Sequence, residues 1–183
     1  MTRHVKGVLF RDYVRMVRRH KGVDWQQHLA PEDLPYLSMV IEAGAWYPMA
    51  TFERLGNAIL RVVSYGDLFP VRAWGRFSAD ELCAEQPMLV APGDPVETLN
   101  RFRVLRSTYF DFDALEVLML HDGAAEIAIA YFMGMPAEEA AAFQTMGFFE
   151  RQLELAGAKE IDVRFRMRSW AGDERTVLTL RWE

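Results

Sequence analysis

The sequence predicts an α+β fold in which N-terminal helices precede a four-stranded antiparallel sheet, the last elements following in strand-strand-helix-strand-strand order. Three observations support this prediction. Apolar residues alternate with charged ones over 161–168, and a second alternating run ends at Trp182, as in a β-hairpin with one buried face. Another pair of alternating runs flanks Asp122-Gly123, a dipeptide that favours a tight hairpin turn. Between the two hairpins, residues 136–157 have the apolar spacing of a helix that covers a sheet.

The sequence pattern of the N-terminal half predicts helices throughout. Residues 8–20 form a short amphipathic helix, and Asp24 caps another over 25–29. Pro31 suits the first turn of a helix that ends at Gly44, and a further helix runs from Pro48 to about Gly66. The apolar faces of these helices consist of Phe10, Val14 and Val17; of Leu34, Leu37 and Ile41; and of Phe52, Leu55, Ile59 and Val62.

The middle of the chain connects these helices to the sheet. Residues 68–70, 74–77 and 78–83 suggest short helices, and the prolines at 87, 92 and 95 make 86–94 irregular. A helix over 95–106 then leads into the first hairpin, 114–132. In the second hairpin, 159–182, the side chains of Leu178, Leu180 and Trp182 are expected to face the core.

Length and composition indicate one globular domain over 1–183. The chain has 183 residues, and 51% of them are hydrophobic, enough to build a full core. Apolar stretches are too short for a transmembrane helix and no secretory signal core appears at the start, so a cytoplasmic protein is expected. Cys83 is the only cysteine, which excludes an internal disulfide.

The first 21 residues are strongly basic in an otherwise acidic chain. They contain seven Lys or Arg residues against one acid, Asp12. Such a helix could meet an anionic lipid surface, nucleic acid or an acidic partner, or it could lie against the acidic body of the same molecule. Nucleic acid is the less favoured partner, because the rest of the chain would repel a phosphate backbone.

The C-terminal pattern resembles a known superfamily. Residues 148–158, the alternating strand after them, the turn at 171–173 and the closing 180–182 are similar to the end of the haem-NO-binding/4-vinyl-reductase superfamily. Residues 5–10 are similar to the opening of an uncharacterised delta-proteobacterial family of this length. The resemblance implies the predicted fold and a homodimer that pairs through its helical part.

The same resemblance implies a haem in some members and a metal in others. Haem-binding members use a histidine on a mid-chain helix and a Tyr-x-Ser-x-Arg motif. Here the histidines are His4, His20, His28 and His121, and that motif does not occur. Members with a metal carry cysteines near the final turn, where this chain has none. We therefore expect neither a haem nor a metal site, and no cofactor.

No catalytic constellation emerges. His121-Asp122 lies at a hairpin tip, where neighbouring side chains point to opposite faces and cannot converge on one substrate. Neither a nucleophile motif nor a glycine-rich phosphate loop is present. We expect no enzymatic activity.

Two groups of residues are candidate sites. The first is an aromatic cluster that either lines a pocket for a small apolar ligand or is plain core. The second is a row of arginines on the last hairpin that either binds an acidic protein or is a solvated face. The preferred hypothesis is a regulatory or scaffold domain acting through protein contacts, the alternative is a ligand-binding sensor, and an enzyme of unknown reaction is the weakest alternative. The pocket candidates are Trp46, Tyr47, Phe52, Tyr65, Phe69, Trp74 and Phe77, and the row consists of Arg164, Arg166, Arg168 and Arg181.

Overall fold

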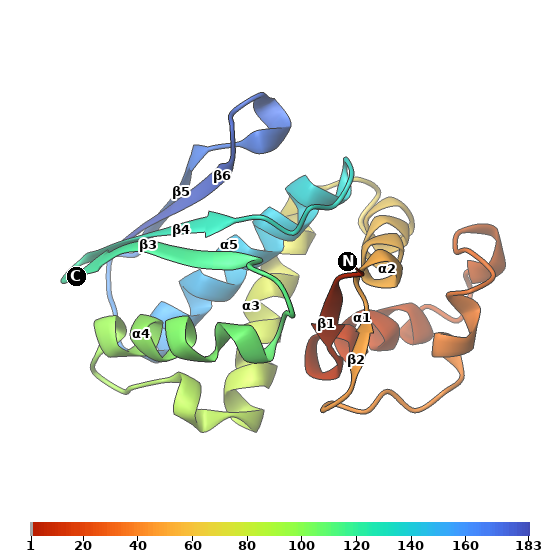
Figure 1. The fold of residues 1–183 in the computed structure, drawn as a ribbon, viewed down its shortest axis with the longest axis horizontal. Coiled ribbons are helices and arrows are strands. Elements are labelled where there is room, and N and C mark those ends of the chain that lie inside the picture. Colours follow the sequence, from red (N-terminus) through yellow and green to blue (C-terminus); the bar gives the residue numbers. More distant parts are fainter. Residues whose placement is uncertain (1) are drawn as a thin grey trace.

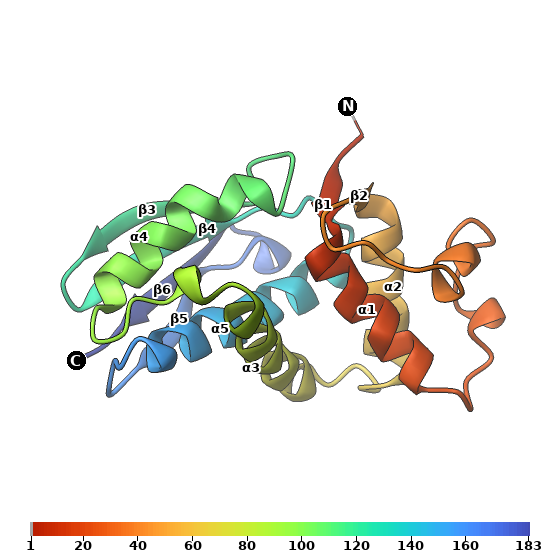
Figure 2. The same ribbon diagram turned by 90° about the horizontal axis from the view of Figure 1, so that it is seen from below.

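The computed structural model describes residues 2–183 and arranges them in two lobes (Figure 1). The N-terminal lobe contains helices α1 (Gly7–Arg19) and α2 (Met49–Val62), which pack side by side (Figure 2). The sheet lobe contains the remaining long helices and the four-stranded sheet. No helix within residues 2–183 combines the length and apolar character that crossing a bilayer requires.

The sheet lobe confirms the predicted fold class. Its strands are β3 (Leu115–His121), β4 (Ala124–Ile129), β5 (Asp162–Met167) and β6 (Thr176–Arg181), all antiparallel in the order β3-β4-β6-β5. The two predicted hairpins thus join through β4 and β6 into one sheet. Bulges interrupt β3 and β5, so strict alternation fails near Leu118 and Arg166.

Helix α5 (Ala137–Leu155) covers one face of the sheet, as predicted for 136–157. Its Phe149 and Leu153 are fully buried, as are Leu178 and Leu180 of β6. Helix α4 (Pro95–Leu105) also confirms the prediction, and Asp94 caps it by accepting a hydrogen bond from Glu97 N–H.

Helix α3 (Leu68–Glu85) is one continuous helix, so the expectation of short pieces was wrong. Pro70 lies in the first turn, where its missing N–H costs nothing, and Asp67 caps that turn through Phe69 N–H. Gly75 does not break the helix. It lets the backbone of α3 approach α5 so closely that an added Cβ would lie 1.9 Å from the Gln144 carbonyl oxygen.

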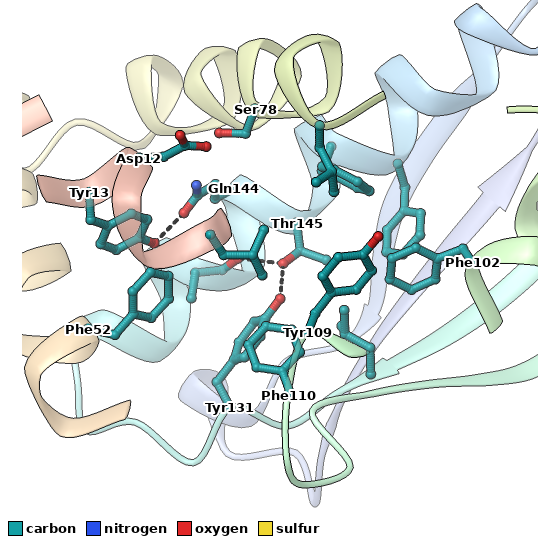
Figure 3. Close-up of a pocket in the computed structure, with 16 residues that line it drawn as sticks. Asp12, Tyr13, Phe52, Ser78, Phe102, Tyr109, Phe110, Tyr131, Gln144 and Thr145 are labelled. Carbon is teal, nitrogen blue, oxygen red and sulfur yellow. Dashed lines mark hydrogen bonds between the residues drawn. The ribbon is translucent and has the colours of Figure 1, made fainter. Parts of the chain in front are cut away.

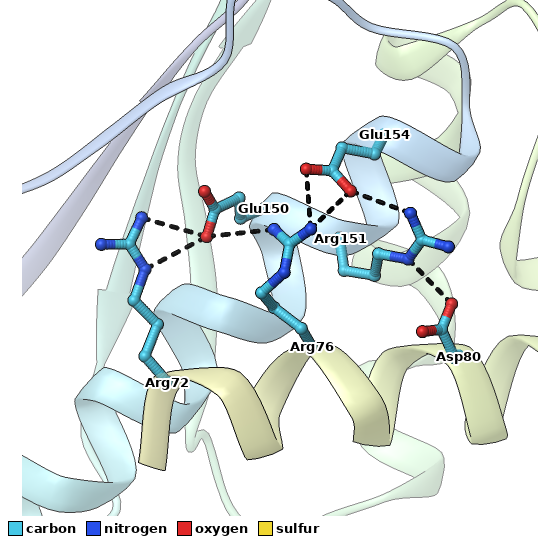
Figure 4. A network of polar contacts seen from close by, with 6 residues as sticks. All are labelled: Arg72, Arg76, Asp80, Glu150, Arg151 and Glu154. Atoms are coloured by element: carbon cyan, nitrogen blue, oxygen red, sulfur yellow. Dashed lines mark hydrogen bonds and ion pairs between the residues drawn. The ribbon is translucent and has the colours of Figure 1, made fainter. Parts of the chain in front are cut away.

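The contact between α3 and α5 is close and heavily ion-paired. Gly147 of α5 mirrors Gly75, because a Cβ there would lie 2.0 Å from the Arg72 carbonyl oxygen. Beside this crossing, three arginines and three acids alternate between the two helices (Figure 4). The network links Arg72 and Arg76 to Glu150, Arg76 and Arg151 to Glu154, and Arg151 to Asp80, at N–O distances of 2.7 to 3.3 Å. Backbone contact and charge together fix this helix pair.

The segment 31–44 does not form the predicted helix and contains only a 3₁₀ turn, Leu34–Leu37. Its backbone carbonyls find a partner elsewhere: Arg18 of α1 donates to Leu37 O at 2.8 Å and to Tyr36 O at 3.0 Å. Asp33 is fully buried and accepts two hydrogen bonds of 2.6 Å from Arg54 of α2. These long-range contacts replace the helical ladder.

Two other N-terminal features differ from or extend the prediction. The short helix over 25–29 is a single 3₁₀ turn, Trp25–Gln27, although Asp24 caps it as predicted. Strands β1 (His4–Lys6) and β2 (Trp46–Pro48) form a second small sheet that the sequence pattern did not indicate.

Most basic residues of the first 21 contact the molecule itself. Arg11 pairs with Glu85 of α3, and Lys6 Nζ lies 4.2 Å from the centre of the Trp46 ring. Arg3 donates to the carbonyl oxygens of Tyr131 and Phe132 at 3.1 and 3.0 Å. The intramolecular alternative therefore accounts for much of this charge.

Candidate functional site

A cavity of about 80 Å³ lies where the two lobes meet (Figure 3). Helices α1 and α2 supply one side of it, and α3, α4, α5 and the start of the sheet supply the other. Its lining is mostly aromatic. The aromatic residues are Tyr13, Phe52, Phe102, Tyr109, Phe110, Tyr131, Phe148 and Phe149, the aliphatic ones are Leu9, Leu82, Leu115 and Ala141, and the polar ones are Asp12, Ser78, Gln144 and Thr145.

Hydrogen bonds hold the three tyrosines of the lining. Tyr13 donates to the side-chain oxygen of Gln144, which links α1 to α5. The Tyr131 hydroxyl bonds to Thr145, whose own hydroxyl donates to the Ala141 carbonyl oxygen at 2.8 Å. Tyr109 donates to Gln86 at 2.6 Å. These bonds fix the orientation of the three tyrosine rings, as expected for a largely preformed ligand site.

One end of the cavity is polar, and a buried hydroxyl there lacks a hydrogen-bond partner. The Ser78 side chain of α3 is buried, and its hydroxyl has no hydrogen-bond partner among residues 2–183. In Figure 3 this hydroxyl is turned toward the carboxylate of Asp12 on α1. Burial raises the pKa of Asp12 from 3.8 to about 6, against the opposing effect of Arg15 and Arg11.

The structure does not gather the predicted pocket residues into one site. Phe52 lines the cavity and stacks on Tyr13 at 3.9 Å between ring centres, while Trp74 lies behind Tyr13. Tyr47 is buried in the N-terminal lobe, stacked on Phe10. The other candidates are partly or largely exposed: Trp46 at 43%, Tyr65 at 89%, Phe69 at 78% and Phe77 at 47%.

Sequence reasoning missed most of the cavity, because its lining comes from elements far apart in the chain. Tyr13 and Asp12 did carry a signal. Tyr13 follows Phe10 by three residues on the apolar face of α1, and Asp12 is the single acid among the basic residues of that helix. Tyr109, Tyr131 and Ser78 carried none, since they enter the cavity from loops and a helix without clear periodicity.

The arginine row lies exposed on the last hairpin, but part of its charge is neutralised there. Arg164 pairs with Asp162 at 2.7 Å, and Arg166 pairs with Glu126 of β4 at 3.2 Å. Within the described chain, Arg168 and Arg181 have no carboxylate at ion-pair distance. Binding of an acidic partner by this row stays a prediction.

The histidines and Cys83 lie outside the cavity lining. His4 is held by Asp111, 2.6 Å from its Nδ1, and His121 bonds to the carbonyl oxygen of Asp122 at 2.9 Å. Burial raises the pKa of Cys83 to about 11, so its thiol is neutral near pH 7 and is a poor nucleophile. Over residues 2–183, no three His, Cys, Asp or Glu side chains lie together as a metal site requires.

The residues around the cavity do not fit a haem. A cofactor of that size needs a pocket of several hundred Å³, and this cavity has about 80 Å³. Helix α4, in the middle of the chain, contains no histidine and presents Phe102 to the cavity. Iron ligation by tyrosine is disfavoured as well, because burial raises the pKa of Tyr13 and Tyr131 and brings that of Tyr109 to about 12. No Lys or Arg of the described chain lines the cavity to bind propionates.

Comparisons with known proteins find similarity in three-dimensional structure but not in sequence. By sequence, no family model and no curated protein matches the chain significantly. By structure, it is similar to an H-NOX protein from S. oneidensis in the Fe(II)NO ligation state, with a TM-score of 0.65, 13% identity, and coverage of 97% of this chain and 99% of that one. The Fe(II) unliganded H-NOX protein from K. algicida matches with a TM-score of 0.67, 11% identity, and coverage of 97% and 96%. A mutant of T. tengcongensis H-NOX matches with a TM-score of 0.63, 14% identity and 97% coverage of both chains. The chain therefore has the H-NOX fold along nearly its whole length.

Proposed function

We propose that this chain is a sensor domain that binds a small apolar ligand in the aromatic cavity, without haem and without catalysis. The observation that carries the proposal is the position of the cavity: its walls come from both lobes, so an occupant contacts both at once. A ligand shifts a conformational equilibrium only through contacts that differ between two states. Contacts to two separate lobes provide such a difference.

The fold favours this sensor hypothesis over the scaffold hypothesis. The H-NOX proteins of similar structure are described with NO or CO bound at Fe(II), so that fold holds small diatomic ligands in those proteins. We infer that this chain keeps the ligand-binding role with a protein cavity in place of the iron. Kinship with the delta-proteobacterial family indicated by residues 5–10 is part of the same proposal.

A scaffold function stays the second candidate. It rests on Arg168 and Arg181, the two members of the row without an ion pair in the described chain. An acidic protein surface is the partner that such a patch would bind. The two functions are compatible, since none of the four arginines of the row lines the cavity.

The test of the sensor proposal is occupancy of the cavity by toluene. We would titrate the labelled protein with toluene and follow backbone amide shifts by NMR, expecting the largest changes around the cavity. Ala141→Leu should abolish these changes, because the added atoms fill the cavity from α5. Ala84→Leu, at an exposed position of α3, adds the same volume outside it and should bind as the original does.

Native mass spectrometry of freshly purified protein complements the titration. A co-purifying small molecule that is lost in Ala141→Leu supports the proposal. Toluene shifts that persist in Ala141→Leu, or none in the original protein, would contradict it and leave the scaffold hypothesis as the better one.

A further inference from the structure

We infer that the polar end of the cavity, formed by Asp12 and Ser78, selects a ligand that carries a hydroxyl group on a small apolar body, a short alcohol or a phenol. This inference rests on the proposed function and specifies the ligand class of the same cavity. It is carried by two polar side chains that face each other across one end of a mostly apolar cavity, whose other polar residues, Gln144 and Thr145, are already hydrogen-bonded to Tyr13 and Tyr131.

Ser78 is the first part of the argument. The residue is 8% exposed, and its hydroxyl oxygen is buried without a hydrogen-bond partner in the described chain. A buried hydroxyl normally bonds to the protein or to water, and leaving one unpaired costs about 1 to 3 kcal/mol. The i−4 carbonyl of α3, which often accepts from a helical serine, does not satisfy it. Ser78 is thus free to donate to an occupant of the cavity.

Asp12 is the second part. Its side chain is 15% exposed and lines the same end of the cavity from α1. It is 3.7 Å from Arg15, an ion pair too long for a good hydrogen bond. The other charged groups that face it are Arg11 on its own helix and Glu81 and Glu85 on α3. A carboxylate in this position accepts hydrogen bonds and has none from the described chain.

The chemistry of the pair selects among ligand groups. A hydroxyl donates its proton to the Asp12 carboxylate and accepts a hydrogen bond from Ser78, so it satisfies both residues at once. A ketone has no proton to donate, and a ligand carboxylate would place a second negative charge beside Asp12. A methyl group in the same place would leave both residues unpaired. The hydroxyl is the group that completes the site.

The size of the cavity limits the apolar body. One water molecule needs roughly 10 to 15 Å³, and an engineered cavity that binds benzene has about 150 Å³, so about 80 Å³ limits the apolar body to a single ring at most. Phenol and toluene, which have the same shape and differ by one hydroxyl in place of one methyl group, are therefore matched probes.

The experiment measures the ratio of the Kd of toluene to the Kd of phenol in the original protein and in variants. Taking a ratio within each protein removes the difference in hydrophobicity between the two probes, as in a double-mutant cycle. Ser78→Ala should lower the ratio about fivefold to tenfold, because phenol loses one hydrogen bond and toluene loses nothing. Asp12→Asn should lower it as well. Ser107→Ala, at an exposed position outside this cavity, should leave it unchanged.

The outcomes distinguish failure of the proposed sensor function from failure of the inferred selection for a hydroxyl group. If neither probe binds the original protein, the proposed function fails and the inference fails with it. If both bind but the ratio is the same in Ser78→Ala and Asp12→Asn as in the original, the sensor function stands and hydroxyl selection is wrong, as expected if a water molecule fills the polar end. Circular dichroism of each variant ensures that folded proteins are compared, and benzoate binding more tightly than phenol would also overturn the inference.

Discussion

Replacement of Asp12 by asparagine should stabilise the protein at pH 7 and weaken its pH dependence. The folded protein holds the pKa of Asp12 at about 6, against an ordinary value of 3.8. The folded state therefore binds more protons than the unfolded state between these two values, and stability falls as the pH rises from about 4 to about 6. At about 1.36 kcal/mol for each pKa unit, the difference corresponds to about 3 kcal/mol lost by pH 7. Asparagine never ionises and avoids this loss.

The assay is urea unfolding at a series of pH values, followed by circular dichroism. Asp12→Asn should exceed the original protein in stability by about 2 to 3 kcal/mol at pH 7, and the two should converge below about pH 4. Glu138, whose pKa burial also raises, is present in both proteins and cancels in the comparison. Asp122→Asn, at the exposed hairpin tip, controls for the loss of one negative charge. A difference between Asp12→Asn and the original that does not change with pH would refute the reasoning.

Four further predictions concern packing, surface and assembly. Gly147→Ala should destabilise the protein by about 1 to 3 kcal/mol in urea unfolding, because its Cβ would collide with the backbone of α3, whereas Gly44→Ala has open space and should change stability by less than about 1 kcal/mol. Phe165→Asp should lower thermal stability strongly, by about 3 kcal/mol, since the ring packs against two other aromatic rings under the sheet; an unchanged melting temperature would contradict this. Charge reversal of Arg166 and Arg168 to glutamate should leave folding nearly intact and abolish capture of an acidic partner in pull-downs. If the charge-reversed protein recovers the same partners as the original, the arginine row is only a solvated face and binds no partner. Light scattering at micromolar concentration should give twice the chain mass of 21.1 kDa, and a constant monomer mass on concentration would exclude the homodimer.

The sheet lobe was predictable because its information is local. Alternation in β5 and β6, and the Asp122-Gly123 turn, where Gly123 adopts a positive φ of 77°, fix each hairpin from neighbouring residues alone. The apolar face of α5 can then be buried against the sheet, although the packing of α3 on its other side does not follow from this pattern. Fold class, strand order of each hairpin and the covering helix all follow from patterns within about 20 residues.

The N-terminal lobe and the cavity were not predictable in the same way. Segment 31–44 has helical spacing, yet Arg18 and Arg54 bind its polar groups from other elements. Nothing in the local sequence identifies these two arginines as its partners. The sequence gives no sign that Gly75 is required for close approach of the α5 backbone, so the continuity of α3 could not be predicted locally. The cavity depends on the same kind of information, because Asp12 and Ser78 are 66 positions apart and come to line one cavity only in the folded molecule.

The contacts that join the two lobes differ in kind from those that hold the sheet lobe together. Helices α3 and α5 meet backbone to backbone at Gly75 and Gly147 beside an ion-pair network, a contact that tolerates little displacement. The N-terminal lobe meets the sheet lobe through single polar contacts and ring packing: Tyr13 of α1 donates to Gln144 beside the cavity and packs on Trp74, and Arg3 donates to the Tyr131 and Phe132 carbonyl oxygens. The two ion pairs of α1 with α3, Arg11 with Glu85 and Arg15 with Glu81, lie at the surface, where such pairs contribute about 1 kcal/mol or less each. If the cavity binds a ligand as proposed, the occupant contacts this junction rather than the close α3–α5 contact, and we expect α1 and α2 to move against a sheet lobe that stays fixed.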